Sequence, residues 1–459
     1  MWASCSWMRP GTRVRSLIRR LPALLHRVWR SLKPTQLLAL GFFSYVLLGV
    51  LLLTLPFAQA KPVRVIDNCF NVVSAISTTG LTTVSVCDSY TFFGELVLLM
   101  LFQLGGIGYM TVTSFIILAR GRALSDTRVE VLSAQFTLPE GFPIIRFVRH
   151  VFIFSFLIEA VGTVLLYEEF WAAGVPQPLW SAVFHSVSAF ATAGFSLNAN
   201  SLEDFRASGI VTITIGTLCY LGAIGFIVLQ DAYWAVRFRR QITFTSKVIL
   251  LITALVLIVE MPLFFLCEPA LRVMPLRERL YAAFFQVMAA STTSGFNTIP
   301  IGKLSAASLT LIVVAMIIGA SPSGTGGGIK TTSLSALLGV AGSTLRGRPK
   351  ITFFRHQIPA HRLHTAVANT TLYVSFLLLG VFLLSLTERQ DYLATVFEVA
   401  SALGTVGLSM GVTGDLTDLG KWIIAGLMFI GRIGPVTLGL ALFHSSSESL
   451  EHIDTDLAT

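Results

Sequence analysis

The sequence predicts an all-α integral membrane protein built from four tandem, parallel helix–pore-loop–helix units, arranged pseudo-fourfold around one pore. Three observations lead to this fold class. Of 459 residues, 54% are hydrophobic and only 12% are charged, and the mean hydropathy is +0.75. Several apolar stretches are long enough to cross a bilayer, and one short motif recurs four times. Because soluble domains average about 25% charged residues, this composition indicates a chain solvated mostly by lipid.

A long apolar stretch is expected to open each unit. These stretches cover residues 37–55, 148–166, 248–266 and 371–386, each close to the ~20 residues that span the hydrocarbon. The net charge of +9 is concentrated in four basic blocks, and one block precedes each stretch. By the positive-inside rule these blocks face the cytoplasm, as do both termini. The composition disfavours soluble multidomain and nucleic-acid-binding proteins, and the blocks could also contact anionic lipid.

The internal repeat covers residues 70–80, 184–194, 285–295 and 397–407. Each copy has Phe ten residues before a final Gly, Ala five before it and Thr two before it. A polar residue stands nine before it in every copy: Asn71, His185, Gln286 and Glu398. The four glycines follow one another at intervals of 114, 101 and 112 residues. Such regular spacing predicts four copies of one unit of about 100 residues.

Each repeat is too short to cross a membrane, since nine helical residues rise only about 13 Å. Irregular backbone at membrane depth is tolerated where protein encloses it or where it lines a watery cavity. Four such dips meeting on one axis would surround it with carbonyl oxygens, which can replace the hydration shell of a monovalent cation. Glycine permits the backbone angles that aim these carbonyls inward. The predicted ion-binding residues are Thr78, Thr79, Gly80, Thr192, Ala193, Gly194, Thr293, Ser294, Gly295, Thr405, Val406 and Gly407.

The second span of the third unit breaks after its apolar run 309–319, and the apolar pattern resumes only at Ser333. The break lies on the inner side of the third dip, so we expect a gate on the exit route of an ion. Its residues are Ala320, Ser321, Pro322, Ser323, Gly324, Thr325, Gly326, Gly327 and Gly328. A kinked packing helix is the alternative. A phosphate-binding P-loop is disfavoured because Ile329 separates the last glycine from Lys330 and no strand precedes it.

Arg432 carries a permanent charge inside the last apolar span. Such a charge faces a cavity or a partner. We expect Arg432 to bind carbonyls of the 320–328 loop and to add an electrostatic barrier to cations. Lys330 either acts in the same way or extends its ammonium to the membrane surface.

Other polar residues have less specific interpretations. Glu159, in the first span of unit 2, either steers ions or makes a hydrogen bond between helices, and the second is favoured. His185 and Glu398 are expected to brace the filter from behind. Three histidines of one cytoplasmic loop (His356, His361 and His364) lack a carboxylate or cysteine at ligand spacing and are interpreted as solvated.

The N-terminal segment lacks the features of a cleavable signal peptide, and residues 17–29 resemble a basic amphipathic helix on the inner surface. The five cysteines suggest neither a zinc site nor a disulfide framework, although Cys69 and Cys87 could pair on the outer side. No catalytic motif of an intramembrane enzyme is found, so no enzymatic activity is expected. The parallel repeats disfavour a symporter with inverted repeats.

These signals divide the chain into six segments. They are a basic N-terminal segment (1–34), pore unit 1 (35–120), a cytoplasmic link with pore unit 2 (121–236), pore unit 3 (237–345), a link with pore unit 4 (346–444) and a cytoplasmic tail (445–459).

From about residue 34 to 444, the four dips, the GGGIK loop and the GRIGP segment resemble the Trk/Ktr/HKT superfamily of potassium transporters. Within it the chain is most similar to the membrane subunit of bacterial Ktr-type systems. The resemblance implies that Gly80, Gly194, Gly295 and Gly407 line the selectivity filter. It also implies that residues 320–330 form a gating loop in contact with Arg432.

The resemblance further implies K⁺ uptake across the cell inner membrane, with no covalently bound cofactor. Glycine at position 80 favours K⁺, and a channel that also passes Na⁺ is the alternative. The expected partners are a second copy of the chain, in a homodimer, and a cytoplasmic ring of nucleotide-binding (RCK-type) regulatory subunits. A membrane potential suffices as driving force, because ~2.3 kcal/mol per 100 mV supports a gradient of roughly fifty-fold.

Overall fold

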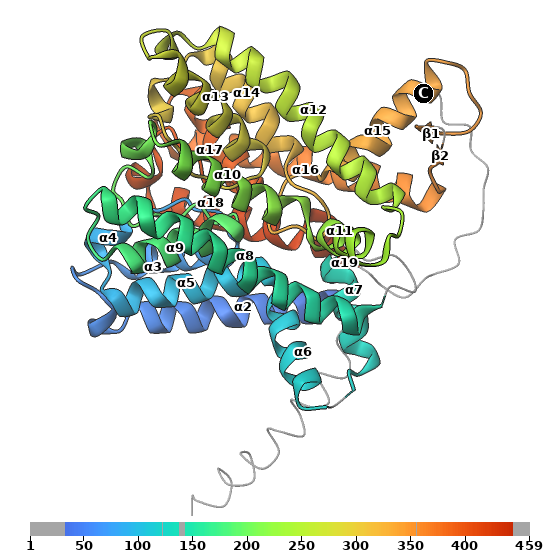
Figure 1. The fold of residues 1–459 in the computed structure, drawn as a ribbon, viewed down its shortest axis with the longest axis horizontal. Coiled ribbons are helices and arrows are strands. Elements are labelled where there is room, and N and C mark those ends of the chain that lie inside the picture. Colours follow the sequence, from blue (N-terminus) through green and yellow to red (C-terminus); the bar gives the residue numbers. More distant parts are fainter. Residues whose placement is uncertain (1–32, 122, 137–142, 355, 444–459) are drawn as a thin grey trace, which may run out of the picture.

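The computed structural model describes residues 33–121, 123–136, 143–354 and 356–443 (Figure 1). The amphipathic helix expected at 17–29 and the tail 445–459 lie outside these residues. The described chain is predominantly helical, as the sequence predicted. Two short strands, β1 (Thr352–Phe353) and β2 (His356–Gln357), form an antiparallel hairpin next to α15.

The helices follow the fourfold repeat. Unit 1 comprises α2 (Pro34–Leu53), η1 (Pro56–Ala58), α3 (Val65–Ile76), α4 (Val86–Ser89), α5 (Phe92–Ile107) and α6 (Tyr109–Ala119), and α7 (Asp126–Phe136) links it to unit 2. Unit 2 comprises α8 (Ile144–Ala172), α9 (Pro178–Phe190), η2 (Glu203–Phe205), α10 (Gly209–Ile224) and α11 (Phe226–Phe238). Unit 3 comprises α12 (Phe244–Cys267), η3 (Pro269–Leu271), α13 (Leu276–Ser291), η4 (Ile301–Lys303), α14 (Ala306–Ile318) and α15 (Thr331–Thr344). Unit 4 comprises α16 (Ala360–Thr387), α17 (Tyr392–Leu403), η5 (Thr413–Asp415), α18 (Asp418–Ile433) and α19 (Pro435–Phe443).

The four first helices, α2, α8, α12 and α16, are each long and apolar enough to cross a membrane. By length and composition, the described residues hold four such spans, or up to seven if each of three bent helix pairs counts as one. The eighth expected span is the pair α14 and α15, which a loop separates. The fold is therefore that of a multi-pass membrane protein.

The second spans of units 1, 2 and 4 also break, which the sequence reading missed. Each bends by 83°, 98° or 94° at a single glycine, Gly108, Gly225 or Gly434, whose φ is close to +90°. A right-handed helix cannot continue through this angle, and only glycine adopts it without strain. The signal was a repeated G-x-I-G (105–108, 222–225 and 431–434), hidden within apolar runs.

The first glycine of each G-x-I-G lets the second span contact the end of its own pore helix. A Cβ added there would lie 2.0–2.2 Å from a carbonyl oxygen of Ile76, Phe190 or Leu403. No side chain fits at that distance. The bend and the close approach therefore both depend on glycines of the same motif.

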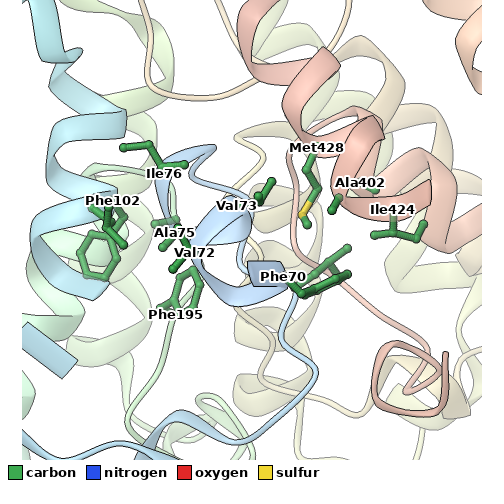
Figure 2. Close-up of a cluster of buried hydrophobic side chains, with 14 of the residues drawn as sticks. Phe70, Val72, Val73, Ala75, Ile76, Phe102, Phe195, Ala402, Ile424 and Met428 are labelled. Atoms are coloured by element: carbon green, nitrogen blue, oxygen red, sulfur yellow. The ribbon is translucent and has the colours of Figure 1, made fainter. Parts of the chain in front are cut away.

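The pore helices α3, α9, α13 and α17 are enclosed by the spans. Around α3, Phe70 packs towards Ile424 and Met428 of α18, while Val72 faces Phe195 (Figure 2). The corresponding phenylalanines, Phe184, Phe285 and Phe397, are fully buried. The recurring Phe thus anchors each pore helix within the bundle. The helices also begin earlier than expected: α3 starts at Val65 rather than Phe70.

On the side where the pore helices begin, called the outer side after the predicted orientation, a carboxylate at or near the end of the first span bonds the start of the second span in three units. Ser208 donates to Glu169 at 2.7 Å, the Ser305 amide donates to Glu268 at 3.0 Å, and Thr417 donates to Glu388 at 2.6 Å. In unit 1 a backbone bridge between Gln59 and Tyr90 closes the same gap. These contacts fix the separation between the outer ends of the two spans.

Both outer cysteines of unit 1, Cys69 and Cys87, are free thiols. The pairing that the sequence left open is therefore absent. The Cys87 thiol instead lies 3.2 Å from the hydroxyl of Ser85.

Candidate ion-conduction site

All four pore helices end in the same backbone geometry. The threonine two residues before each glycine (Thr78, Thr192, Thr293 and Thr405) is left-handed, with φ between 48° and 56°. The amide of the next residue donates to the carbonyl five positions earlier, at 2.7–2.9 Å in every unit. This is the Schellman ending of a helix, here with a β-branched residue where glycine is usual. The repeated threonine therefore marks a backbone conformation that every unit shares.

The four glycines after these threonines form a closed ring. A Cβ added to Gly80 would lie 2.5 Å from the Ala193 carbonyl oxygen, and one on Gly194 would lie 2.7 Å from that of Ser294. The ring closes through Gly295, at 2.5 Å from the Val406 oxygen, and Gly407, at 2.0 Å from the Thr79 oxygen. The order around the ring is 1–2–3–4, so units 1 and 3 are opposite, as are units 2 and 4.

A cavity of about 310 Å³ opens on the outer side of this ring. All four glycines line it, together with polar residues of the outer loops such as Asn198 and Asn297. The ring therefore lines the inner end of this cavity, which is called the vestibule below.

Glu203 supplies a carboxylate to the vestibule wall. Partial burial raises the pKa of this carboxyl, and a 2.9 Å hydrogen bond from the Asn297 amide partly opposes the rise. When ionised, Glu203 attracts cations towards the mouth.

On the inner side, residues 319–330 form a loop rather than a kinked helix. The Thr325 amide donates to the Gly222 carbonyl, and the Ser321 amide to that of Ala223, at 3.1 and 3.0 Å. The loop therefore extends from unit 3 to the glycine-bearing end of α10.

The loop packs directly against the threonines that end the pore helices. Thr78 donates to the Thr325 carbonyl at 3.1 Å, and the hydroxyls of Thr192 and Thr325 lie 2.9 Å apart. The Gly327 amide donates to Thr293 at 3.2 Å, and a Cβ at Gly327 would lie 2.5 Å from the Thr405 hydroxyl. All four units thus meet the loop immediately inside the glycine ring.

Arg432 holds the loop from α18. Its guanidinium donates to the carbonyls of Thr325 and Gly105 and, at 3.0 Å, to the Thr78 hydroxyl. At the same position in G-x-I-G, units 1 and 2 have Gly106 and Ala223, so among the three motifs only that of unit 4 carries a charge there. Lys330 donates to the loop carbonyls of Gly326 and Gly327. Its ammonium therefore turns to the loop instead of the membrane surface.

The structure also shows the contacts of the other polar residues considered in the sequence analysis. The Gln103 amide donates to both carboxylate oxygens of Glu159, at 2.9 and 3.0 Å, which is the favoured interhelical bond. His185 and Glu398 lie behind the ring and contact residues that follow the glycines. The histidines at 356, 361 and 364 are exposed, and no cluster of metal-ligand residues occurs among the described residues.

The sequence reading missed a buried ion pair beside the first pore helix. Lys421 of α18 bonds Asp67 of α3 at 2.7 Å, and both are at most 5% exposed. Arg64 also bonds Asp67, and it reaches Asp418 at 2.9 Å. A charged residue inside an apolar span was the available signal, as for Arg432.

Comparison with known proteins agrees with this architecture. Residues 42–452 match the family model TrkH, described as cation transport protein. The chain is 34% identical to Ktr system potassium uptake protein B of Bacillus subtilis, covering 94% of this chain and 98% of that protein. It is also 34% identical to potassium/sodium uptake protein NtpJ of Enterococcus hirae, covering 91% and 94%. The crystal structure of the potassium transporter TrkH from Vibrio parahaemolyticus superposes with a TM-score of 0.70 at 22% identity, over 88% of this chain and 84% of that one. The chain therefore belongs to the TrkH family of cation transport proteins.

Proposed function

We propose that this protein takes up K⁺ through a pore whose selectivity filter is the ring of Gly80, Gly194, Gly295 and Gly407. The observation that carries the proposal is the closed ring, in which each glycine lies against the main chain of the next unit. The three residues ending at each glycine would present their carbonyls to the ion. The relatives named as potassium uptake proteins support the choice of ion.

The loop 320–328 acts as the gate, and the side chains of Arg432 and Lys330 hold it in the closed position. It touches the threonines at the inner end of the filter, where a leaving ion must pass. Two fixed cations beside that path oppose another cation in transit. Opening requires the loop to leave the threonines and its carbonyls to release both side chains.

Uptake of ⁸⁶Rb⁺ into liposomes containing the purified full-length protein tests this function. A negative interior potential should drive uptake that excess external K⁺ suppresses. Equal suppression by Na⁺ would contradict K⁺ selectivity, and the absence of any cation flux would contradict the pore.

A pore that passes both ions is the second candidate. The relative from Enterococcus hirae carries potassium and sodium in its name and is as similar to this chain as the B. subtilis protein. Direct ²²Na⁺ uptake at matched concentration separates the two functions.

The proposed assembly is a homodimer, with one pore per chain, in the cell inner membrane. Both termini face the cytoplasm, where an RCK-type nucleotide-binding ring docks. The six segments with boundaries at 34, 120, 236, 345 and 444 serve as functional units. Co-purification with candidate cytoplasmic subunits, and cysteine accessibility at both ends of the chain, test this arrangement.

A further inference from the structure

The four polar residues nine positions before the filter glycines are fully buried on their pore helices. Each side chain bonds a residue two or three positions after its own glycine. It therefore holds in place the outer end of the segment that contains the glycine. The chemistry of this contact differs between neighbouring units.

In units 1 and 3 the side chain is an amide, and it holds the main chain directly. The Thr83 amide donates to the Asn71 oxygen at 3.2 Å, and the Thr298 amide donates to the Gln286 oxygen at 3.0 Å. In both units the bonded amide lies three residues after the glycine.

In units 2 and 4 the residue is ionisable, and it holds a serine two residues after the glycine. The Nδ1 of His185 lies 2.8 Å from the Ser181 carbonyl, which makes Nδ1 the donor and leaves Nε2 to accept from Ser196 at 2.9 Å. The Ser409 hydroxyl donates to Glu398 at 2.9 Å.

Each serine hydroxyl also accepts a hydrogen bond from a backbone amide of the outer loop. Ser196 accepts from the Asn198 amide at 3.0 Å, and Ser409 accepts from the Gly411 amide, also at 3.0 Å. The serine hydroxyl therefore connects the pore helix to the outer loop in each unit, and in unit 4 the Thr413 hydroxyl also donates to Glu398. Removal of the serine hydroxyl breaks both of these serine bonds at once.

Units 2 and 4 lie opposite each other in the ring, so the bracing is twofold although the filter backbone is fourfold. We propose that His185 with Ser196, and Glu398 with Ser409, are positioning pairs that determine ion specificity. They hold the carbonyls of units 2 and 4 at the spacing that suits K⁺. This inference rests on the proposed function, because it assigns specificity to the same filter.

The physical reason is that discrimination between two ions depends on carbonyl positions, whereas flux needs only an open path. A loosened strand can move its carbonyls towards a smaller ion. Loss of either serine hydroxyl should therefore admit Na⁺ while K⁺ flux continues.

The test measures ⁸⁶Rb⁺ and ²²Na⁺ uptake by the full-length protein in liposomes and compares the ratio of the two rates. Ser196→Ala and Ser409→Ala should each lower the Rb⁺/Na⁺ ratio about five-fold, which corresponds to about 1 kcal/mol and to one hydrogen bond. Ser196→Thr keeps the hydroxyl and should restore the ratio. Glu398→Gln keeps an acceptor for Ser409 and should behave like the original protein, whereas Glu398→Leu should not.

Thr82→Ala is the matched control. Thr82 stands two residues after Gly80, as Ser196 does after Gly194, but Asn71 holds the next residue's amide instead. Its ratio should not change. The ratio does not depend on the amount of protein inserted, and the two serines give independent tests if one variant fails to fold.

An unchanged ratio in both serine variants, with or without lower flux, would overturn the proposal, as would an equal loss in Thr82→Ala. Failure of the proposed function looks different. In that case the original protein itself would show no Rb⁺ uptake, or equal Rb⁺ and Na⁺ uptake.

Discussion

The outer and inner halves of the proposed pore differ in symmetry. Outside, four units repeat one backbone: a left-handed threonine, a common helix ending and a glycine against the next unit. Inside, a single loop from unit 3 lies against the threonines and a single arginine from unit 4 bonds it, and the described residues of units 1 and 2 contain no equivalent of either. The half that would select the ion is a repeated structure, whereas the half that would control passage is built once. Substitutions of the four ring glycines should therefore act alike, whereas substitutions around the gate should differ from unit to unit.

The largest expected effect comes from the filter ring. Gly295→Ala should lower Rb⁺ uptake by at least about ten-fold, because a Cβ would lie 2.5 Å from the Val406 oxygen at a backbone φ of +73°. Gly426→Ala on α18 is the control, since a Cβ there meets no atom within 4 Å. The same loss of uptake on substitution of Gly80, Gly194 or Gly407 by Ala would support a fourfold filter. Normal uptake in any one of these variants would contradict it.

The next effect concerns the gate, and its sign is opposite. Arg432→Ala should raise Rb⁺ uptake roughly three- to ten-fold, because it removes a fixed charge and frees the Thr325 carbonyl. Arg432→Lys keeps the charge but loses the forked contact of the guanidinium. Its Rb⁺ uptake should therefore lie between those of the original protein and Arg432→Ala. Flux that stays unchanged in Arg432→Ala, with the protein inserted normally, would contradict the barrier role.

A smaller effect is expected at the vestibule. Glu203→Gln should lower uptake about two-fold at low ionic strength and have little effect at high salt, because the loss concerns long-range attraction alone. Since burial raises the pKa of Glu203, lowering the external pH should remove its charge earlier than for an ordinary glutamate. Uptake should therefore fall on acidification in the original protein, and this part of the fall should be missing in Glu203→Gln.

The smallest effect on transport is expected at the outer contact between Glu388 and Thr417. Thr417→Ala removes the N-cap of α18 and should cost about 1 kcal/mol of stability. Thermal unfolding in detergent should show a lower midpoint, while the Rb⁺/Na⁺ ratio stays the same. A changed ratio would mean that the outer ends of the spans also position the filter.

The difference between the repeated filter and the single gate also explains which features could be predicted from the sequence. The repeated motif identified the glycine register and the four dips because four weak signals coincided. The loop at 320–328 was predictable because a Gly/Ser/Pro stretch cannot remain helical. The contact of Arg432 with this loop followed from the cost of a charge within a span.

Other features had only weak local signals. The bends at Gly108, Gly225 and Gly434 lie within apolar runs that a periodicity pattern reads as continuous helix. The early start of α3 was hidden because Asp67 and Asn68 resemble a polar link, although both are buried in the fold. The pair between Lys421 and Asp67 joins residues 354 positions apart, and only the assembled ring brings them together.

The closure of the ring within one polypeptide has a further consequence. In a pore assembled from four identical short chains, every substitution appears four times, so a lone plug or a lone charge on the axis cannot be encoded. Here each quarter has its own sequence, and a change in one quarter leaves the other three intact. Covalent linkage thus allows control of passage to be altered by single substitutions without rebuilding the surface that recognises the ion.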